Sequence, residues 1–163
     1  MRNDMRRNSW NGGWYTLVPF SVVFLAMLGV AWGVEAIRID QISHKTFEDT
    51  IQHLEWSCSG YGLTVVAQLD YRNILAKING HAKKSRMLEV MRRAWLKTIV
   101  ERDPAAALDV PIRIYVYERD DGRTVVSYYR PSATFAAYGK ADWHELGQEL
   151  DDVLRQIVHM ATK

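Results

Sequence analysis

The stretch RIYVYERDDGRTVVSYY, residues 113–129, is the segment that decides the fold. Alternating large and β-branched side chains on both sides of an Asp-Gly pair predict two strands, over residues 110–118 and 124–129. Asp121-Gly122 predicts a tight two-residue turn between them, because glycine readily adopts the positive φ that such a turn requires. The segment is therefore expected to form an antiparallel β-hairpin.

A two-residue loop also predicts which side chains share a face of the hairpin. Tyr117 would pair with Val126, and Tyr115 with Tyr128. One face would then carry Arg113, Tyr115, Tyr117 and Tyr128, and the opposite face would carry Ile114, Val116, Val125 and Tyr129. A tyrosine ring is apolar while its hydroxyl needs a partner, so three interpretations of the tyrosine-rich face stay open. It could be covered by a second layer of the same domain, form a subunit interface, or line a ligand groove.

Outward from the hairpin, hydrophobic periodicity predicts further strands and helices. Cys58 falls on the apolar face of the first predicted helix and is expected to be a buried structural thiol, whereas the segment 87–91 fits a strand or a helix equally well. The order predicts an α+β fold for residues 36–163, with a small mixed, mostly antiparallel sheet packed with helices. The predicted strands cover 37–42 and 63–69, and the predicted helices cover 46–59, a short segment after Asp70, 95–102 and 142–159.

An uncharged apolar run from Trp14 to Val34 precedes this domain. At about 1.5 Å per residue it would extend over about 32 Å, the thickness of the hydrocarbon core of a bilayer. Trp14 and Tyr15 at its start and Trp32 near its end are expected at the two membrane interfaces. A cleaved signal peptide is the competing interpretation, but the length of the run favours a retained single-pass transmembrane helix.

Basic residues around the run predict its orientation. Arg2, Arg6 and Arg7 precede it, whereas the residues after it mix both signs of charge. Because basic flanks stay on the cytoplasmic side, residues 1–13 are expected to be a cytoplasmic tail and 14–34 a transmembrane helix. The domain over 36–163 would then be periplasmic, at a bacterial inner membrane.

Several stretches of the domain carry a family resemblance. They read TFEDTI at residues 46–51, GLTVVA at 62–67 and DPAAALDVP at 103–111, the last continuing through 112–118 to Pro131. These stretches resemble an uncharacterised bacterial family, the domain of unknown function 302, over residues 37–135. Many members carry an Asn-Pro pair where this chain reads RRAW, at residues 92–95. The resemblance implies a compact α+β domain that tends to form homodimers, and it implies no activity.

Residue types that carry catalysis or bind metals do not form a recognisable pattern. His144-Glu145 begins like the HExxH zinc motif, but Gln148 stands where the second histidine is needed. A single cysteine excludes an internal disulfide and a CxxC redox pair. We therefore expect no metal site and no cofactor, and an enzyme remains a hypothesis without a residue set to support it.

Basic residues dominate the segment from Lys77 to Lys97, where Glu89 is the one acid. A solvated surface is the simplest interpretation. The functional interpretation is a docking patch for an acidic protein or for anionic lipid headgroups, formed by Lys83, Lys84, Arg86, Arg92 and Arg93. The net charge of the whole chain, +2, is too small to indicate a nucleic-acid partner.

These features together predict a membrane-anchored, non-enzymatic interaction domain, an accessory subunit of a larger inner-membrane complex. A respiratory or photosynthetic electron-transfer complex would suit such a subunit, although no residue selects it. The expected partners are the lipid bilayer and either other membrane-protein subunits or a second copy of the chain. The alternative function is a periplasmic sensor that binds a small ligand or anion at Arg113, Tyr115, Tyr117 and Tyr128.

Overall fold

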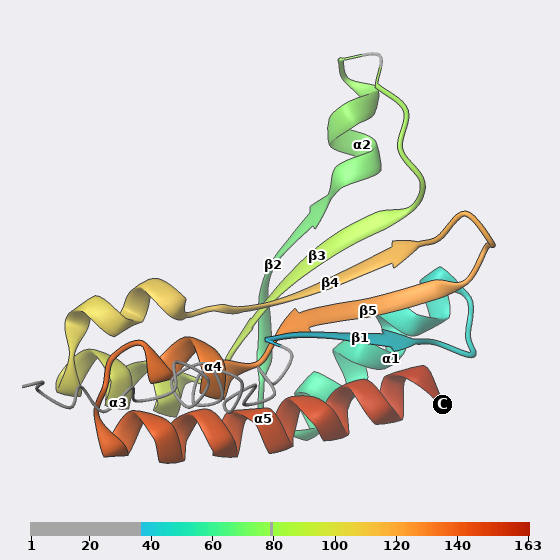
Figure 1. Cartoon of the computed structure of the whole chain (residues 1–163). Helices are drawn as coiled ribbons and strands as arrows, with labels where there is room; N and C mark the ends of the chain where they lie inside the picture. Colours follow the sequence, from blue (N-terminus) through green and yellow to red (C-terminus); the bar gives the residue numbers. More distant parts are fainter. Residues whose placement is uncertain (1–36, 79) are drawn as a thin grey trace, which may run out of the picture. The chain divides into compact units, whose positions relative to one another are not determined.

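The computed structural model describes residues 37–78 and 80–163 (Figure 1). The predicted tail, the predicted span and its interface residues Trp14, Tyr15 and Trp32 lie outside the described residues. Within the described ranges, no helix is both long and apolar enough to cross a membrane. The elements, in chain order, are β1 (Arg38–Ile42), α1 (Phe47–Gly60), β2 (Thr64–Asp70), α2 (Tyr71–Ala76), β3 (Ser85–Met91), α3 (Arg93–Arg102), the 3-10 helix η1 (Pro104–Asp109), β4 (Ile112–Glu118), β5 (Thr124–Tyr129), α4 (Pro131–Ala136) and α5 (Ala141–Thr162).

The five strands form one sheet in the order β1-β5-β4-β3-β2. Each of its pairings is antiparallel, so the expectation of a mixed sheet was wrong in that respect. The strands from β2 to β5 pair with their neighbours in sequence and reverse direction each time, and β1 completes the sheet at the free edge of β5. No crossover returns a strand parallel to its neighbour, which is what a parallel pairing would need.

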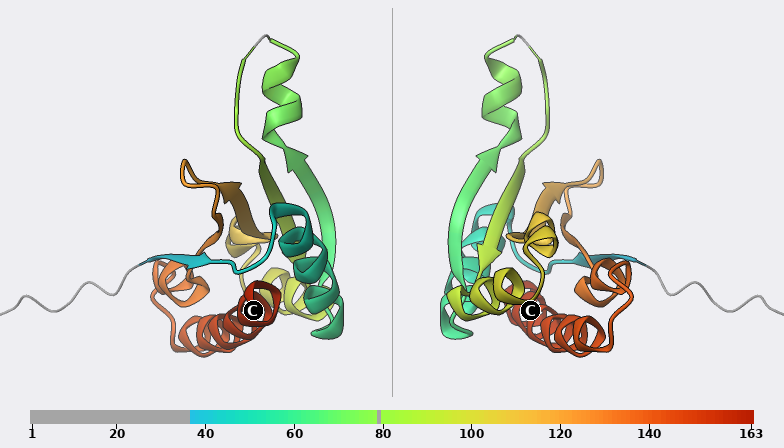
Figure 2. Two further views of the ribbon diagram at one scale, coloured as in Figure 1. Left: turned by 90° about the vertical axis from the view of Figure 1, so that its right-hand side faces the viewer. Right: turned by 90° about the vertical axis from the view of Figure 1, so that its left-hand side faces the viewer.

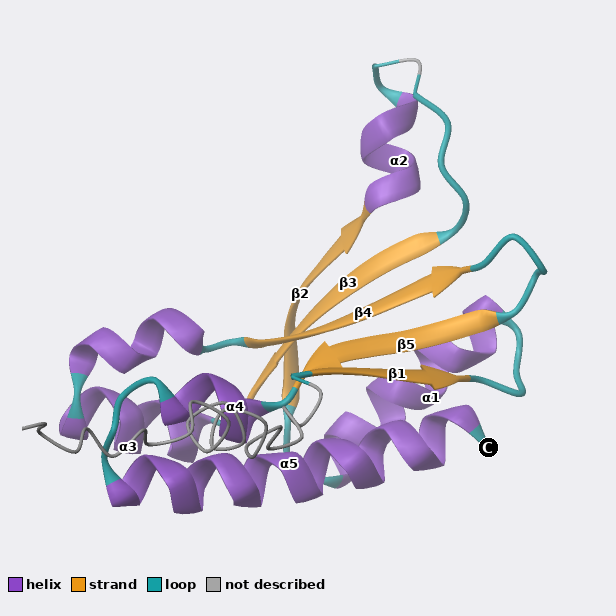
Figure 3. Ribbon diagram, viewed as in Figure 1, coloured by secondary structure: helices purple, strands orange, loops and turns teal. Residues whose placement is uncertain are grey.

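Two long helices, α1 and α5, pack against each other and against one face of this sheet (Figure 3). Thr46 caps α1 by accepting a hydrogen bond from the Asp49 N–H. The apolar stripe of α5 is buried, as is Cys58 on α1. The core between helices and strands includes Phe47, Leu54, Leu88, Ile114, Val116, Val126, Leu154 and Ile157.

The turn of the β4–β5 hairpin differs from the prediction by one residue. The Arg119 N–H donates to the Arg123 carbonyl, and the Gly122 N–H donates back to the Arg119 carbonyl. The loop therefore consists of Asp120, Asp121 and Gly122, with Gly122 at a φ of 78°. This is the three-residue hairpin in which a glycine with positive φ forms a bulge.

The longer loop shifts the register and exchanges two tyrosines between the faces. Tyr115 pairs with Ser127 rather than with Tyr128, and Tyr128 pairs with Ile114. Tyr128 is therefore on the helix-covered face, where only 7% of its surface is exposed, whereas Tyr129 is 61% exposed on the other face. The predicted grouping of Tyr128 with Tyr115 and Tyr117 on one face was wrong, because one residue of slip inverts every side chain of a strand.

Two short helices were not predicted, and each begins at a proline. Pro104 opens η1 and Pro131 opens α4, at positions where the missing N–H of proline is tolerated. α4 lies against α5 at Gly147, where a Cβ atom would come 2.6 Å from the Ser132 Cα. The ambiguous segment at 87–91 proves to be part of β3.

An extension of the sheet stands away from the rest of the domain. It consists of α2 and the following loop as far as Lys84, and both views in Figure 2 show it projecting beyond the strands. No residue of α2 is buried. We call residues 71–78 and 80–84 the arm.

Candidate functional site

The face of the sheet opposite α1 and α5 is the candidate site, and we call it the open face. Its side chains alternate with those of the core along each strand. The strand pairings place Arg38 beside Tyr129, and Met87 beside Tyr115. The open face is formed by Arg38, Met87, Arg113, Tyr115, Tyr117, Ser127 and Tyr129.

Aromatic rings form a continuous row across this face. The rings of Tyr115 and Tyr117 stack with their centroids 5.4 Å apart. Tyr71, at the start of α2, adds a third ring 5.6 Å from that of Tyr115. These rings help to line a groove of about 400 Å³, together with Arg38, Met87, Arg113, Ser127, Tyr128 and Tyr129.

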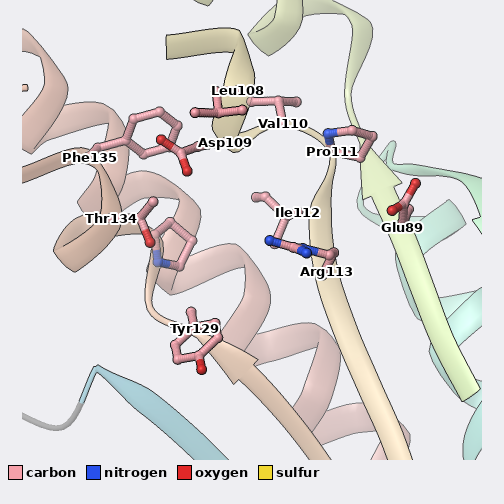
Figure 4. A pocket seen from close by; sticks show the side chains of 11 residues that line it. Glu89, Leu108, Asp109, Val110, Pro111, Ile112, Arg113, Tyr129, Thr134 and Phe135 are labelled. Atoms are coloured by element: carbon pink, nitrogen blue, oxygen red, sulfur yellow. The ribbon is translucent and has the colours of Figure 1, made fainter. Parts of the chain in front are cut away.

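A second cavity, of about 420 Å³, continues from the first at the beginning of β4 (Figure 4). Arg113 and Tyr129 line both cavities. Arg113 lies opposite Glu89 in the strand register, yet its side chain extends away from Glu89, toward the side of the cavity where Thr134 lies (Figure 4). Within the described residues Arg113 makes no ion pair, although the carboxylates of Glu89 and Asp109 line the same cavity. Its guanidinium lies where the two cavities meet.

The other arginine of the open face is neutralised. Arg38 forms an ion pair of 2.8 Å with Asp40, and the Ser127 hydroxyl donates to the same carboxylate at 2.6 Å. The Ser127 hydrogen bond, assisted by Arg38, holds the pKa of Asp40 below its usual range. Asp40 therefore stays charged between the Arg38 guanidinium and the Ser127 hydroxyl.

Asp109, in the wall of the second cavity, is likewise engaged. It accepts a hydrogen bond of 2.6 Å from the Tyr138 hydroxyl, which raises the pKa of Tyr138 to about 12. Across the described part of the chain, no group of His, Cys, Asp and Glu side chains is placed to hold a metal ion. The open face carries tyrosine hydroxyls, aromatic surface and the Arg113 guanidinium, with the Glu89 carboxylate opposite Arg113 in the strand register.

The five residues of the predicted basic patch do not come together. Lys83, Lys84 and Arg86 lie at one end of β3, and Arg92 and Arg93 follow its other end. Several are already paired: Lys83 with Asp120, Lys84 with Glu48 and Arg86 with Asp70. Arg92 donates to the Tyr61 carbonyl and lies 4.4 Å from the centroid of the Trp95 ring. The basic residues that are close in sequence therefore lie at two separate places, at the two ends of β3, and do not form one patch.

The alternation along the strand correctly predicted that Arg113, Tyr115 and Tyr117 share one face, and five other residues of the site were missed. The register error assigned Ser127 and Tyr129 to the opposite face. Arg38, Met87 and Tyr71 come from other elements and carry no local signal of their role, because only strand pairing brings them to the groove. Cys58 is buried as predicted, and burial raises the pKa of its thiol to about 12.

Comparison with known proteins supports the fold and adds no activity. A crystal structure described as an uncharacterized conserved protein, DUF302, from Bacillus stearothermophilus superimposes with a TM-score of 0.74. The two chains are 15% identical, and the match covers 79% of this chain and 100% of the other. No curated protein matches the sequence. The family described as domain of unknown function DUF302 matches residues 39–161, and the chain therefore belongs to that family.

Proposed function

We propose that this chain is a membrane-anchored, non-enzymatic interaction domain that docks on another polypeptide through its open face. The observation that carries the proposal is the composition of that face. An antiparallel sheet with one solvated face normally alternates apolar residues inward with polar residues outward. Here the outward positions of β4 and β5 include three tyrosines, Tyr115, Tyr117 and Tyr129.

Tyrosine and arginine are the residue types enriched at the centre of protein interfaces. Their flat rings give a large contact area at a low entropic cost, and each hydroxyl can still find a partner. Arg113 stands among them without an ion pair in the described residues, and a carboxylate of a docking protein could provide one. The groove at this place is an open depression of about 400 Å³, suited to an anchoring side chain.

The partner we favour is another subunit of an inner-membrane complex, with this chain as an accessory subunit. The apolar run at 14–34 would hold the domain at the membrane, and a respiratory or photosynthetic electron-transfer complex remains a suitable host. A lone anchor without charged intramembrane residues has no means of transport by itself. A second copy of the chain is the other possible occupant of the face.

The test of docking compares two sets of exposed aromatic residues in the full chain. Tyr115→Ser with Tyr129→Ser removes rings from the open face, whereas Trp56→Ser removes a 60% exposed ring from α1, on the helix side of the molecule. Each variant is extracted in mild detergent and analysed by native mass spectrometry, with circular dichroism as a check on folding. The tyrosine variant should lose its partner and Trp56→Ser should keep it. A folded tyrosine variant that retains the same partner would contradict the proposal.

The location is tested separately by reporter fusions at Lys163. Alkaline phosphatase fused there should be active, because the basic residues before the run predict a periplasmic domain. A fluorescent cytoplasmic reporter at the same position should be dark. Inactive phosphatase together with a fluorescent reporter would contradict the orientation and leave the docking proposal standing.

A second candidate function, a small-anion sensor, is supported by the position of Arg113. A guanidinium between two cavities, with tyrosine hydroxyls nearby, could bind a carboxylate or phosphate group. Calorimetric titration with inorganic phosphate and with acetate tests this directly. Binding that is lost in Arg113→Ala and kept in Arg93→Ala, a matched exposed arginine on α3, would support the sensor.

A further inference from the structure

The arm is a built structure with fixed contacts at both ends of α2. At its base, Asp70 caps α2 by accepting from the Asn73 N–H at 3.0 Å, and Arg86 contacts the same carboxylate at 3.4 Å. Beyond the end of the helix, the Gly80 N–H donates to the Leu75 carbonyl at 2.9 Å. A Cβ at Gly80 would lie 3.2 Å from that oxygen, so the loop closes tightly over the helix.

The end of the arm is apolar and exposed. Ile74 belongs to the last turn of α2, and Ile78 lies in the turn that follows the helix. They are 48% and 73% exposed. Isoleucine is among the residues most often buried in proteins, and two at the end of a projection are not explained by the packing of this domain.

The charge of the arm is all of one sign. No aspartate or glutamate occurs between Tyr71 and Lys84. Arg72 precedes the two isoleucines and Lys77 lies between them, and both cations are exposed without an ion pair among the described residues. The arm therefore combines exposed isoleucines with cations immediately beside them, of which Arg72 also helps to lower the pKa of the Asp70 and Glu48 carboxyls at its base.

We propose that the arm docks on an anionic lipid bilayer, with Ile74 and Ile78 entering the headgroup layer and Arg72 and Lys77 contacting lipid phosphates. Apolar residues next to basic ones form the composition by which surface helices bind anionic membranes. The shape favours lipid over protein, because a projecting apolar end can sink into a deformable layer, whereas a protein would have to offer a matching hollow (Figure 2). The inference rests on the proposed membrane location and adds a second point of contact to it.

The experiment places an environment-sensitive fluorophore at the end of the arm in the full chain. Ile78→Cys provides the attachment site, and Cys58 is buried and will not react. Leu108→Cys, at a position 88% exposed on η1, provides the matched control. Both labelled proteins are mixed with nanodiscs of phosphatidylglycerol or of phosphatidylcholine, and doxyl-labelled lipid serves as a quencher.

The label at 78 should shift to shorter wavelength and be quenched in phosphatidylglycerol discs, and much less so in phosphatidylcholine discs. The label at 108 should not change. Arg72→Ser with Lys77→Ser should weaken docking of the arm about 25-fold, since each cation near an anionic surface contributes about fivefold. A label at 78 that stays as hydrated as the label at 108 in both discs would overturn the proposal. So would a response that requires added membrane proteins, because the partner would then be a protein.

Failure of the anchor is distinguished by co-elution of the chain with the discs. A chain that elutes apart from the discs, yet whose label at 78 still shifts, would refute the anchor and support the arm. A chain that co-elutes while its label remains in water would retain the anchor and refute the arm.

Discussion

Tyr128 and Tyr129 are adjacent in sequence, yet substitution of Tyr128 is predicted to destabilise the fold far more than substitution of Tyr129. The observed register places Tyr128 on the helix-covered face, opposite Ile114, and Tyr129 on the open face, opposite Arg38. Replacing each with alanine therefore removes the same atoms from two different environments. The comparison tests the register on which the candidate site depends.

The expected magnitudes follow from the burial of each ring. Tyr128 is 7% exposed, and truncating a buried aromatic residue to alanine costs about 3–4 kcal/mol, including the cavity that is left. A loss of about 3 kcal/mol lowers the melting temperature by about 10 °C in a domain of this size. Tyr129 is 61% exposed, so Tyr129→Ala should change the free energy of unfolding by no more than about 0.5 kcal/mol.

The assay is urea unfolding of residues 36–163, followed by tryptophan fluorescence and by circular dichroism. Coincident transitions from the two probes would justify a two-state free energy. With the two-residue turn that the sequence suggested, Tyr129 would be the core residue and the order of the two variants would reverse. Equal losses for both variants would refute the assignment of one face as core and the other as open.

Three further predictions concern stability, each measured by urea unfolding of the same domain. Gly147→Ala should cost about 1–3 kcal/mol of stability, because the new Cβ would press on Ser132 in α4. The control, Gly60→Ala, adds a Cβ with no atom within 4 Å and should be neutral or slightly stabilising. Equal effects of the two substitutions would refute the close approach of α4 and α5. Raising the pH from 9 toward 12 should destabilise the fold, because the Cys58 thiol ionises near pH 9.0 in the unfolded chain but only near pH 12 in the folded one. In this range the unfolded state binds fewer protons, so the free energy of unfolding falls by about 1.4 kcal/mol per pH unit through this group. The Cys58→Ala variant should show a correspondingly smaller loss of stability. Gly122→Val should cost about 1–2 kcal/mol of stability through the positive φ at this position alone, since no atom lies within 4 Å of the new Cβ. Gly122→Asn should cost less. A valine variant as stable as the parent would show that the turn is misassigned.

The positions of most helices and strands follow from the sequence. The long helix of the C-terminal region and the helix beginning after Thr46 both show clear periodicity, and both are present as α5 and α1. The hairpin at 113–129 is also present, because an Asp-Gly pair between β-branched runs gives few alternatives. These elements depend on interactions between residues close together in the chain, so a short segment of sequence is sufficient to predict them.

The register of the hairpin was decided by the tertiary structure. An Asp-Gly pair fits a loop of two residues or of three, and local chemistry does not choose between them. Burying Tyr128 beside Ile114 against α5 is possible only with the longer loop. The helices that make this choice lie far away in the sequence.

The candidate site illustrates the same division. Alternation along β4 was sufficient to place Arg113, Tyr115 and Tyr117 on one face, because a strand has a period of two. Their neighbours Arg38, Met87 and Tyr71 arrive from three other elements through strand pairing. The extended geometry of β3 likewise separates basic residues that are close in the chain. Local sequence determined which side chains of a strand share a face. Long-range packing of α1 and α5 determined which face of the sheet is buried and which is left open.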